Sequence, residues 1–133
     1  MSQENVELVG RVFSVGNPGL YQLISATTED FVWDTTRFEG WPDPREYVGI
    51  PGLAEFVQAW VEPYEDWRVE VEEIVNAGHR VVALLRQLGR LRGSESEVEM
   101  RYGIVYSFRD GKISRAAPYA TPEQALEAAG LSE

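Results

Sequence analysis

The second half of the chain alternates apolar and polar residues with a period of two, and no other feature of the sequence limits its fold as strongly. Arg68-Val69-Glu70-Val71-Glu72 alternates strictly, and from Val98 to Phe108 an apolar side chain returns at every second position. This alternation is typical of strands that pack one face on a core and leave the other in water or against a partner. Residues 81–85 are apolar throughout, which predicts a central strand packed on both faces.

Turn residues divide this half of the chain into four strands. Asn76-Ala77-Gly78-His79 and Gly93-Ser94-Glu95 interrupt the pattern. Asp110-Gly111 is the strongest hairpin signal, because glycine tolerates the positive φ that a tight primed turn requires. The last strand covers Lys112 to Tyr119. We predict a meander of four antiparallel strands.

The rest of the chain predicts mainly helices. Apolar residues at helical spacing indicate a helix within residues 2–13, a short one near 20–24, and the longest over 51–64, which a proline opens. Thr121-Pro122-Glu123-Gln124 is a helix-capping pattern, and Gly130 closes the helix that follows it.

One further strand and one loop lie between these helices. Phe31-Val32-Trp33 is β-branched and aromatic, so it predicts a strand that ends near Asp34. Residues 40–51 are rich in Gly and Pro and predict a loop. With 133 residues and no linker or repeat, we expect a single domain over 1–133.

Charge and composition exclude several classes of function. The chain has 22 acidic and 12 basic residues, a net charge of -10, so its field repels nucleic acid and anionic membrane surfaces. With no cysteine and one histidine, it has little with which to bind a transition metal, and we expect no metal and no cofactor. The lack of cysteine suits a reducing cytoplasm, and neither a signal peptide nor a membrane-spanning run is recognisable. We expect a cytoplasmic protein with no membrane partner.

Four stretches of the chain resemble a known family. They are Asp30 to Asp34, Tyr47 to Phe56, Arg109-Asp110-Gly111-Lys112-Ile113, and Glu123 to Leu131. Together with the order of elements they are similar to SnoaL-like bacterial members of the nuclear-transport-factor-2-like superfamily. The resemblance spans nearly the whole chain and implies an α+β fold, in which a cone-shaped, curved antiparallel sheet wraps around N-terminal helices and one long helix and encloses a pocket. It implies no single reaction, because the superfamily includes ketosteroid isomerases, polyketide cyclases, epoxide hydrolases, dehydratases and members without known chemistry.

The resemblance transfers few catalytic residues to this chain. Asp34 matches the general base of ketosteroid isomerases and is our catalytic candidate; the alternative is a strand-end aspartate that accepts backbone hydrogen bonds from Thr35, Thr36 or the following loop. The position of the oxyanion-hole aspartate of those enzymes is Ile104, and the position of the acid/base aspartate of SnoaL-type cyclases is Pro118. Neither residue can transfer a proton. We therefore do not expect steroid isomerisation or SnoaL-type cyclisation by the family mechanisms.

Aromatic residues indicate an apolar pocket on the concave side of the sheet. We expect Trp33, Trp60, Tyr102 and Tyr106 to ring it, although plain core packing would also account for most aromatic side chains. Small residues on one face of the last strand would leave volume opposite the helix that carries Trp60. Such a pocket would suit flat hydrophobic compounds, including steroids and aromatic polyketides.

Arg86 interrupts an apolar stripe in the central strand. It is a candidate clamp for an anion or a carbonyl group. The alternative is a cross-strand ion pair with Glu70, Glu72, Glu97 or Glu99, because a buried arginine is costly unless it is paired. The candidate ligand-binding residues are thus Trp33, Trp60, Arg86, Tyr102, Ile104, Tyr106 and Pro118.

Two hypotheses for function remain open. The chain is either a small-molecule pocket protein that transfers protons in a hydrophobic carbonyl or polyketide-like compound, as an isomerase, cyclase or lyase does, or a non-catalytic module for ligand binding or dimerisation. Asp34 and the small residues of the last strand favour the enzyme. The absence of both family aspartates favours the module.

The sheet face turned away from the helices predicts a homodimer. We expect this face to be too apolar for water at its centre and to be surrounded by charged residues, which is the anatomy of an interface that a two-fold axis can pair with itself. The expected apolar residues are Val81, Ala83, Leu85, Gly89, Gly103 and Val105, and the expected charged ones are Glu97, Glu99, Arg101 and Arg115.

Overall fold

The computed structural model describes residues 2–12 and 25–131. The helices are α1 (Ser2–Val12), α3 (Gly49–Val61) and α4 (Pro122–Ala128). The strands are β1 (Thr27–Asp34), β2 (Glu46–Val48), β3 (Tyr64–Asn76), β4 (Arg80–Leu91), β5 (Glu97–Arg109) and β6 (Lys112–Tyr119). The short helix predicted near 20–24 lies outside the described residues.

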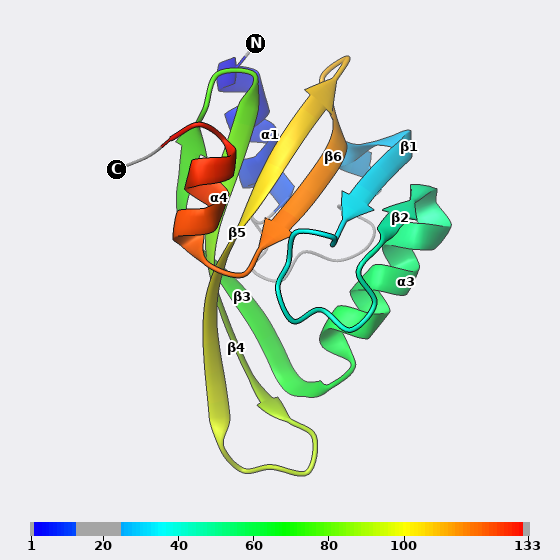
Figure 1. The fold of residues 1–133 in the computed structure, drawn as a ribbon, viewed down its shortest axis with the longest axis vertical. Helices are drawn as coiled ribbons and strands as arrows, with labels where there is room; N and C mark the ends of the chain where they lie inside the picture. The colour runs from blue at the N-terminus through cyan, green and yellow to red at the C-terminus, as the bar shows by residue number, and fades with distance from the viewer. Residues whose placement is uncertain (1, 13–24, 132–133) are drawn as a thin grey trace.

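The strands of the described residues form one curved sheet that does not close (Figure 1), in the order β2-β1-β6-β5-β4-β3. β3, β4, β5 and β6 are antiparallel neighbours in chain order, so the predicted meander is confirmed. β1 pairs with β2 antiparallel and with β6 parallel, which makes the sheet mixed. The α+β class and the cone-shaped fold implied by the resemblance are confirmed.

Local sequence signals account for the hairpin between β5 and β6 and for both ends of α4. Asp110 and Gly111 have φ values of 54° and 79°, as a primed hairpin turn between β5 and β6 requires. At the start of α4, the Thr121 hydroxyl accepts a hydrogen bond from the backbone N–H of Gln124 at 3.1 Å. Gly130, at a φ of 82°, follows the end of that helix. Each of these signals depends on a few neighbouring residues, which is why it can be read from the sequence.

Helices cover both faces of the sheet. α1 and α3 lie on the concave face, where Val9 and Leu53 belong to the main hydrophobic core. α4 lies on the opposite, outer face against β4 and β5 (Figure 1), where Ala125 packs on Val82 and Val105. The concave face with its two helices positions the candidate site.

Gly103 allows α4 to approach the outer face of β5. A Cβ atom at this position would lie 2.5 Å from the Cβ of Ala125 and 3.3 Å from Cδ2 of Leu84. The first distance is far inside van der Waals contact, so any side chain here would push the helix away. The absence of a side chain at residue 103 is therefore a packing requirement.

The two faces of β4 are the reverse of those predicted. The sequence analysis assigns Val81 and Leu85 to the outer face, but the register pairs them with Tyr106 and Tyr102, whose side chains belong to the concave core. Residues directly opposite each other on paired strands share a face, so Arg86 points outward. Because residues 81–85 are apolar at every position, alternation within this strand cannot tell one face from the other.

The outer face also differs from the predicted dimer surface. α4 of the same chain covers the apolar centre around Gly103 and Val105. Beyond α4 the face carries cross-strand ion pairs, among them Arg101 with Glu72 at 3.0 Å. The uncovered part of this face is therefore charged, whereas the prediction placed apolar residues at its centre.

Two predicted boundaries shift in the structure. α3 ends at Val61, and Tyr64, predicted as its last core-facing residue, is the first residue of β3. The predicted loop over 40–51 contains β2, because Glu46–Val48 pairs with β1, a partner that local sequence cannot reveal.

Within the described residues no helix is both long enough and apolar enough to span a membrane.

Candidate functional site

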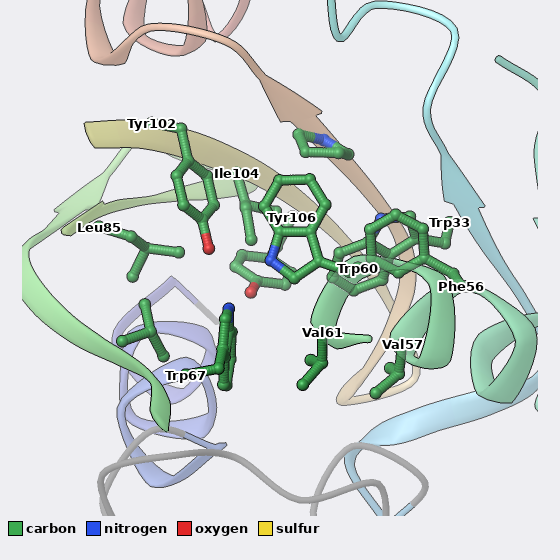
Figure 2. Close-up of a pocket in the computed structure, with 12 residues that line it drawn as sticks. Trp33, Phe56, Val57, Trp60, Val61, Trp67, Leu85, Tyr102, Ile104 and Tyr106 are labelled. Atoms are coloured by element: carbon green, nitrogen blue, oxygen red, sulfur yellow. The ribbon is translucent and has the colours of Figure 1, made fainter. Parts of the chain in front are cut away.

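A cavity of about 70 Å³ lies between α3 and the concave face of the sheet (Figure 2). Its walls are almost entirely apolar, and half of them are aromatic. The residues that line it are Trp33, Phe56, Val57, Trp60, Val61, Trp67, Val69, Leu85, Tyr102, Ile104, Tyr106 and Pro118.

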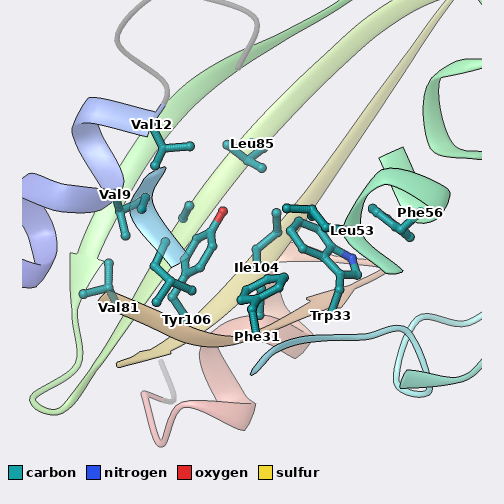
Figure 3. Close-up of a cluster of buried hydrophobic side chains, with 14 of the residues drawn as sticks. Val9, Val12, Phe31, Trp33, Leu53, Phe56, Val81, Leu85, Ile104 and Tyr106 are labelled. Carbon is teal, nitrogen blue, oxygen red and sulfur yellow. The ribbon is translucent and has the colours of Figure 1, made fainter. Parts of the chain in front are cut away.

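Ring contacts hold the aromatic walls in place. Phe56 and Trp60 are one helical turn apart on α3, so they share a face, and their ring centroids are 5.6 Å apart. Trp33 of β1 stacks on Phe56 at 4.7 Å, and Tyr102 of β5 meets Trp60 edge-on at 5.3 Å. Figure 3 shows that Trp33, Phe56, Ile104 and Tyr106 also belong to the hydrophobic core that extends to α1. The cavity is thus a gap in a well-packed core.

Gln87 joins two of the walls by hydrogen bonds. Its side-chain oxygen accepts from Nε1 of Trp60 at 2.7 Å and from the hydroxyl of Tyr102 at 3.1 Å. Gln87 is 3% exposed, and it shares the concave face of β4 with Leu85, two residues earlier. The arrangement satisfies the polar ends of Trp60 and Tyr102 and fixes their rings.

Tyr106 differs from Tyr102 because its hydroxyl has no hydrogen-bond partner among the described residues. Figure 2 shows the hydroxyls of both tyrosines pointing inward, toward the middle of the lining side chains. Burial raises the pKa of Tyr102 and of Tyr106 above the usual value for tyrosine. Both side chains are therefore protonated at neutral pH, and the Tyr106 O–H is free to donate. Nε1 of Trp33 is also buried and has no hydrogen-bond partner among the described residues.

The structure brings most of the sequence-predicted ligand-binding residues together. One of them, Arg86, lies elsewhere, as does the catalytic candidate Asp34. Those that line the cavity are Trp33, Trp60, Tyr102, Ile104, Tyr106 and Pro118.

Arg86 does not reach the cavity, which corrects its candidacy as a ligand clamp. Its Nε lies 2.6 Å from Oε2 of Glu99 and its Nη1 lies 3.0 Å from Oε1 of Glu70. Both carboxylates are on neighbouring strands of the outer face, so the cross-strand ion pair weighed as the alternative is the one that forms. The physical reason is the reversed assignment of the two faces of β4.

Asp34 lies outside the cavity as well. Oδ1 accepts hydrogen bonds from the backbone N–H of Thr36 at 2.9 Å and from the hydroxyl of Thr36 at 2.6 Å. Oδ2 is 3.4 Å from Nη2 of Arg115. Trp33 points to the cavity, and the next residue of a strand points to the opposite face, so Asp34 faces a depression on the outer side. The geometry is that of the hydrogen-bonded strand-end aspartate, and it corrects the expectation of a carboxylate in the pocket.

Sequence reasoning did not identify several residues of the site. Gln87 interrupts the apolar residues of β4, and a lone amide among Leu84, Leu85 and Leu88 was a usable signal. The sequence pattern places Leu85 on the outer face, where the structure has it on the concave one, and it indicates Phe56 and Val57 only as apolar positions of the helix over 51–64. No group of three side chains suited to holding a metal ion occurs within the described residues.

The curved sheet and the helices that enclose a small apolar cavity place this protein in the class of α+β pocket proteins with a cone-shaped fold. Residues 15–116 match the model of the SnoaL-like domain, and the chain belongs to this family. No curated protein sequence matches the chain significantly.

Solved structures share the fold at low sequence identity. A candidate SnoaL-like polyketide cyclase from Jannaschia sp. CCS1 aligns with a TM-score of 0.73 and 20% identity, over 96% of this chain and 91% of that chain. A protein of ketosteroid isomerase-like fold from Catenulispora acidiphila DSM 44928, in complex with trimethylamine, aligns with a TM-score of 0.69 and 14% identity, over 94% and 93%. A candidate polyketide cyclase from Xanthomonas campestris pv. campestris aligns with a TM-score of 0.67 and 21% identity, over 96% and 97%. At these identities the likeness establishes the fold alone.

Proposed function

We propose that the cavity binds a small, mainly apolar molecule that carries one hydrogen-bond acceptor, such as a ketone or an aldehyde. The proposal depends chiefly on the hydroxyl of Tyr106, which is buried in the cavity wall without a partner among the described residues. A buried hydroxyl left unpaired costs about 1–3 kcal/mol, and a ligand oxygen would recover this free energy. The indole N–H of Trp33 can only donate and is also buried without a partner among the described residues, which favours an acceptor on the ligand.

The cavity limits the size of the ligand. Its volume of about 70 Å³ is roughly half that of the ~150 Å³ apolar cavity known to hold benzene. Steroids and aromatic polyketides are too large for it unless several side chains move. The proposal therefore narrows the hydrophobic ligand expected from the sequence to a molecule smaller than a benzene ring. The trimethylamine held by the Catenulispora protein is a molecule of this size and supports the size limit alone.

The residues around the cavity favour binding over proton-transfer catalysis. Neither a carboxylate nor an imidazole is among the described residues that line it. Residues 13–24 contain no Asp, Glu or His, so that segment has no such group to contribute. Because the pKa of Tyr102 and of Tyr106 is raised, both hydroxyls stay protonated at neutral pH and act as hydrogen-bond donors, not as proton acceptors. Non-catalytic ligand binding is accordingly the function we propose.

Titration of ¹⁵N-labelled protein with 2-butanone tests the proposal. The chain has four tryptophans, so the indole N–H region of the NMR spectrum is simple, and Trp→Phe variants assign it. We expect saturable shifts of the Trp33 and Trp60 indole signals. In Tyr106→Phe, which lacks the donor, the affinity for 2-butanone should fall about three- to tenfold, the loss expected for one neutral hydrogen bond.

Two other probes test whether the cavity instead binds a small cation or a molecule as large as a steroid. Trimethylammonium chloride tests whether the aromatic walls bind a small cation through their ring faces. Saturable binding of this cation together with no binding of the ketone would contradict the proposed acceptor. A response to a steroid such as androstenedione, but to neither small probe, would contradict the size limit. If none of the three moves the indole signals, the cavity is a packing defect and the proposal fails.

A further inference from the structure

A second concave site lies on the outer face of the sheet, on the opposite side from the cavity. It is a depression of about 270 Å³ over the last part of β5 and over β6 from Arg115 onward, next to Arg37 of the loop that follows β1. Three arginines, Arg37, Arg80 and Arg115, line it together with Asp34 and Ser107. It shares no lining residue with the apolar cavity.

The strand register places two of these arginines in one row. Arg80 of β4 is directly opposite Ser107 of β5, and Ser107 is directly opposite Arg115 of β6. Directly opposed residues share a face, and neighbouring strands are about 4.8 Å apart. The two arginines therefore start from strands roughly 10 Å apart, on either side of Ser107, and the guanidinium group of Arg115 extends toward Glu46 of β2. Arg37, from the loop after β1, supplies a third cation at the edge of the same depression.

The carboxylates in the depression do not neutralise all three arginines. Arg115 pairs with Glu46 at 2.6 Å and more distantly with Asp34 at 3.4 Å. Asp34 is already occupied, because its other oxygen accepts two hydrogen bonds from Thr36. The acidic groups at the site are thus committed to Arg115 and Thr36.

Arg80 and Arg37 keep donors for a ligand. Nη1 of Arg80 donates to the backbone carbonyl of Ala128 at 3.1 Å, and its Nε lies 3.3 Å from Nε2 of His79. Neither Arg80 nor Arg37 forms an ion pair with a carboxylate in the part of the chain that the structure describes. Two guanidinium groups without carboxylate partners, close together in a chain of net charge -10, form a local positive site.

The smaller part of the lining of this depression is apolar. It consists of Val105, Ala117 and the ring of Tyr119, and is called the apolar floor below. Arg37 and Tyr119 also line a neighbouring depression, together with Glu39 and Glu127. These two carboxylates would repel an anion from the neighbouring depression and favour its binding in the one that Arg80 and Arg115 also line.

We propose that this depression binds a small organic anion, whose carboxylate or phosphate group is held by Arg37, Arg80 and Arg115 and whose apolar part lies on Val105 and Ala117. The planar guanidinium group matches the oxygen atoms of either anion in a two-pronged arrangement. The apolar floor favours an organic anion over an inorganic ion, because only the organic molecule removes apolar surface from water there.

Titration of ¹⁵N-labelled protein with phenyl phosphate at low ionic strength tests this site. We expect saturable shifts of the backbone N–H signals of Val105, Ser107 and Ala117 at ligand concentrations up to about 10 mM, an affinity range typical of a small, partly exposed site. Benzoate should produce the same pattern, inorganic phosphate a weaker one, and neutral phenol none. The indole signals of Trp33 and Trp60 should stay in place, because the cavity is on the other face.

Charge variants decide whether the named arginines bind the anion. Arg37→Gln and Arg80→Gln should each weaken phenyl phosphate binding about tenfold, the value expected for one charge-assisted hydrogen bond. Arg37 makes no hydrogen bond or ion pair with the described residues, so its variant tests the site even if loss of the Arg80 contact to Ala128 disturbs α4. Arg92→Gln removes the same charge at the distant end of β4 and should leave binding unchanged. Equal affinity in all three variants, or no saturable shift in the wild type, would overturn the proposal.

Discussion

Replacing Tyr106 by Phe should make the ligand-free protein more stable. In most buried positions the loss of a tyrosine hydroxyl removes a hydrogen bond, but the Tyr106 hydroxyl has no partner among the described residues. Relief of that unpaired group is worth about 1–3 kcal/mol. The void left by one oxygen atom costs about 0.3–0.5 kcal/mol at about 24 cal/mol per Å³. We expect a net gain of about 1 kcal/mol in the free energy of unfolding and a rise of about 3 °C in Tm.

Tyr102→Phe is the matched control, because it removes the same atom from the same cavity wall. The Tyr102 hydroxyl donates to Oε1 of Gln87 at 3.1 Å, so its removal should lower the free energy of unfolding by about 0.5–1.5 kcal/mol. Urea unfolding followed by tryptophan fluorescence and by circular dichroism measures both changes. If Tyr106→Phe loses as much stability as Tyr102→Phe, its hydroxyl has a hydrogen-bond partner, and the main argument for a ligand acceptor fails.

Three further predictions concern the outer face. Gly103→Ala should lower the free energy of unfolding, measured in urea, by about 1–3 kcal/mol, because its new methyl group would meet Ala125 of α4. The double variant with Ala125→Gly should recover part of this loss. Asp34→Asn should lower the free energy of unfolding by about 1–2 kcal/mol, because Asp34 accepts hydrogen bonds from Thr36. It should leave 2-butanone binding intact, because Asp34 lies outside the cavity. Weaker ketone binding in this variant would show that Asp34 does contribute to the ligand site. A homodimer through the outer sheet face remains our proposal. Because the uncovered part of that face is charged, we expect light scattering to show the mass of a dimer that falls toward that of the monomer in high salt. A monomer mass at all salt concentrations refutes the dimer.

Much of the fold follows from local sequence patterns. The turn at Asp110-Gly111 depends on two adjacent residues with positive φ, and the cap at Thr121 depends on one side chain and the N–H three residues later. The alternation along β5 placed Tyr102, Ile104 and Tyr106 on one face, and all three line the cavity. Signals of this kind are reliable because the interactions behind them span only a few residues.

Other features of the fold and of the site depend on which distant segments of the chain pair or pack together. β1 pairs in parallel with β6, more than eighty positions later in the chain, and no local signal names that partner. The site differs from its prediction at Arg86 and Asp34 for the same reason, since each lies on the face that strand pairing turned outward.

The sequence by itself determined the strands, the turns, the helical stripes and the aromatic character of the site, because periodicity and turn chemistry act over short distances. The tertiary structure alone decided which face of β4 meets the core, where α4 packs, how small the cavity is, and that the Tyr106 hydroxyl in its wall has no partner among the described residues. A strand that is apolar on both faces, as at 81–85, can be buried either way round at similar cost, so only the register with its neighbours selects one arrangement.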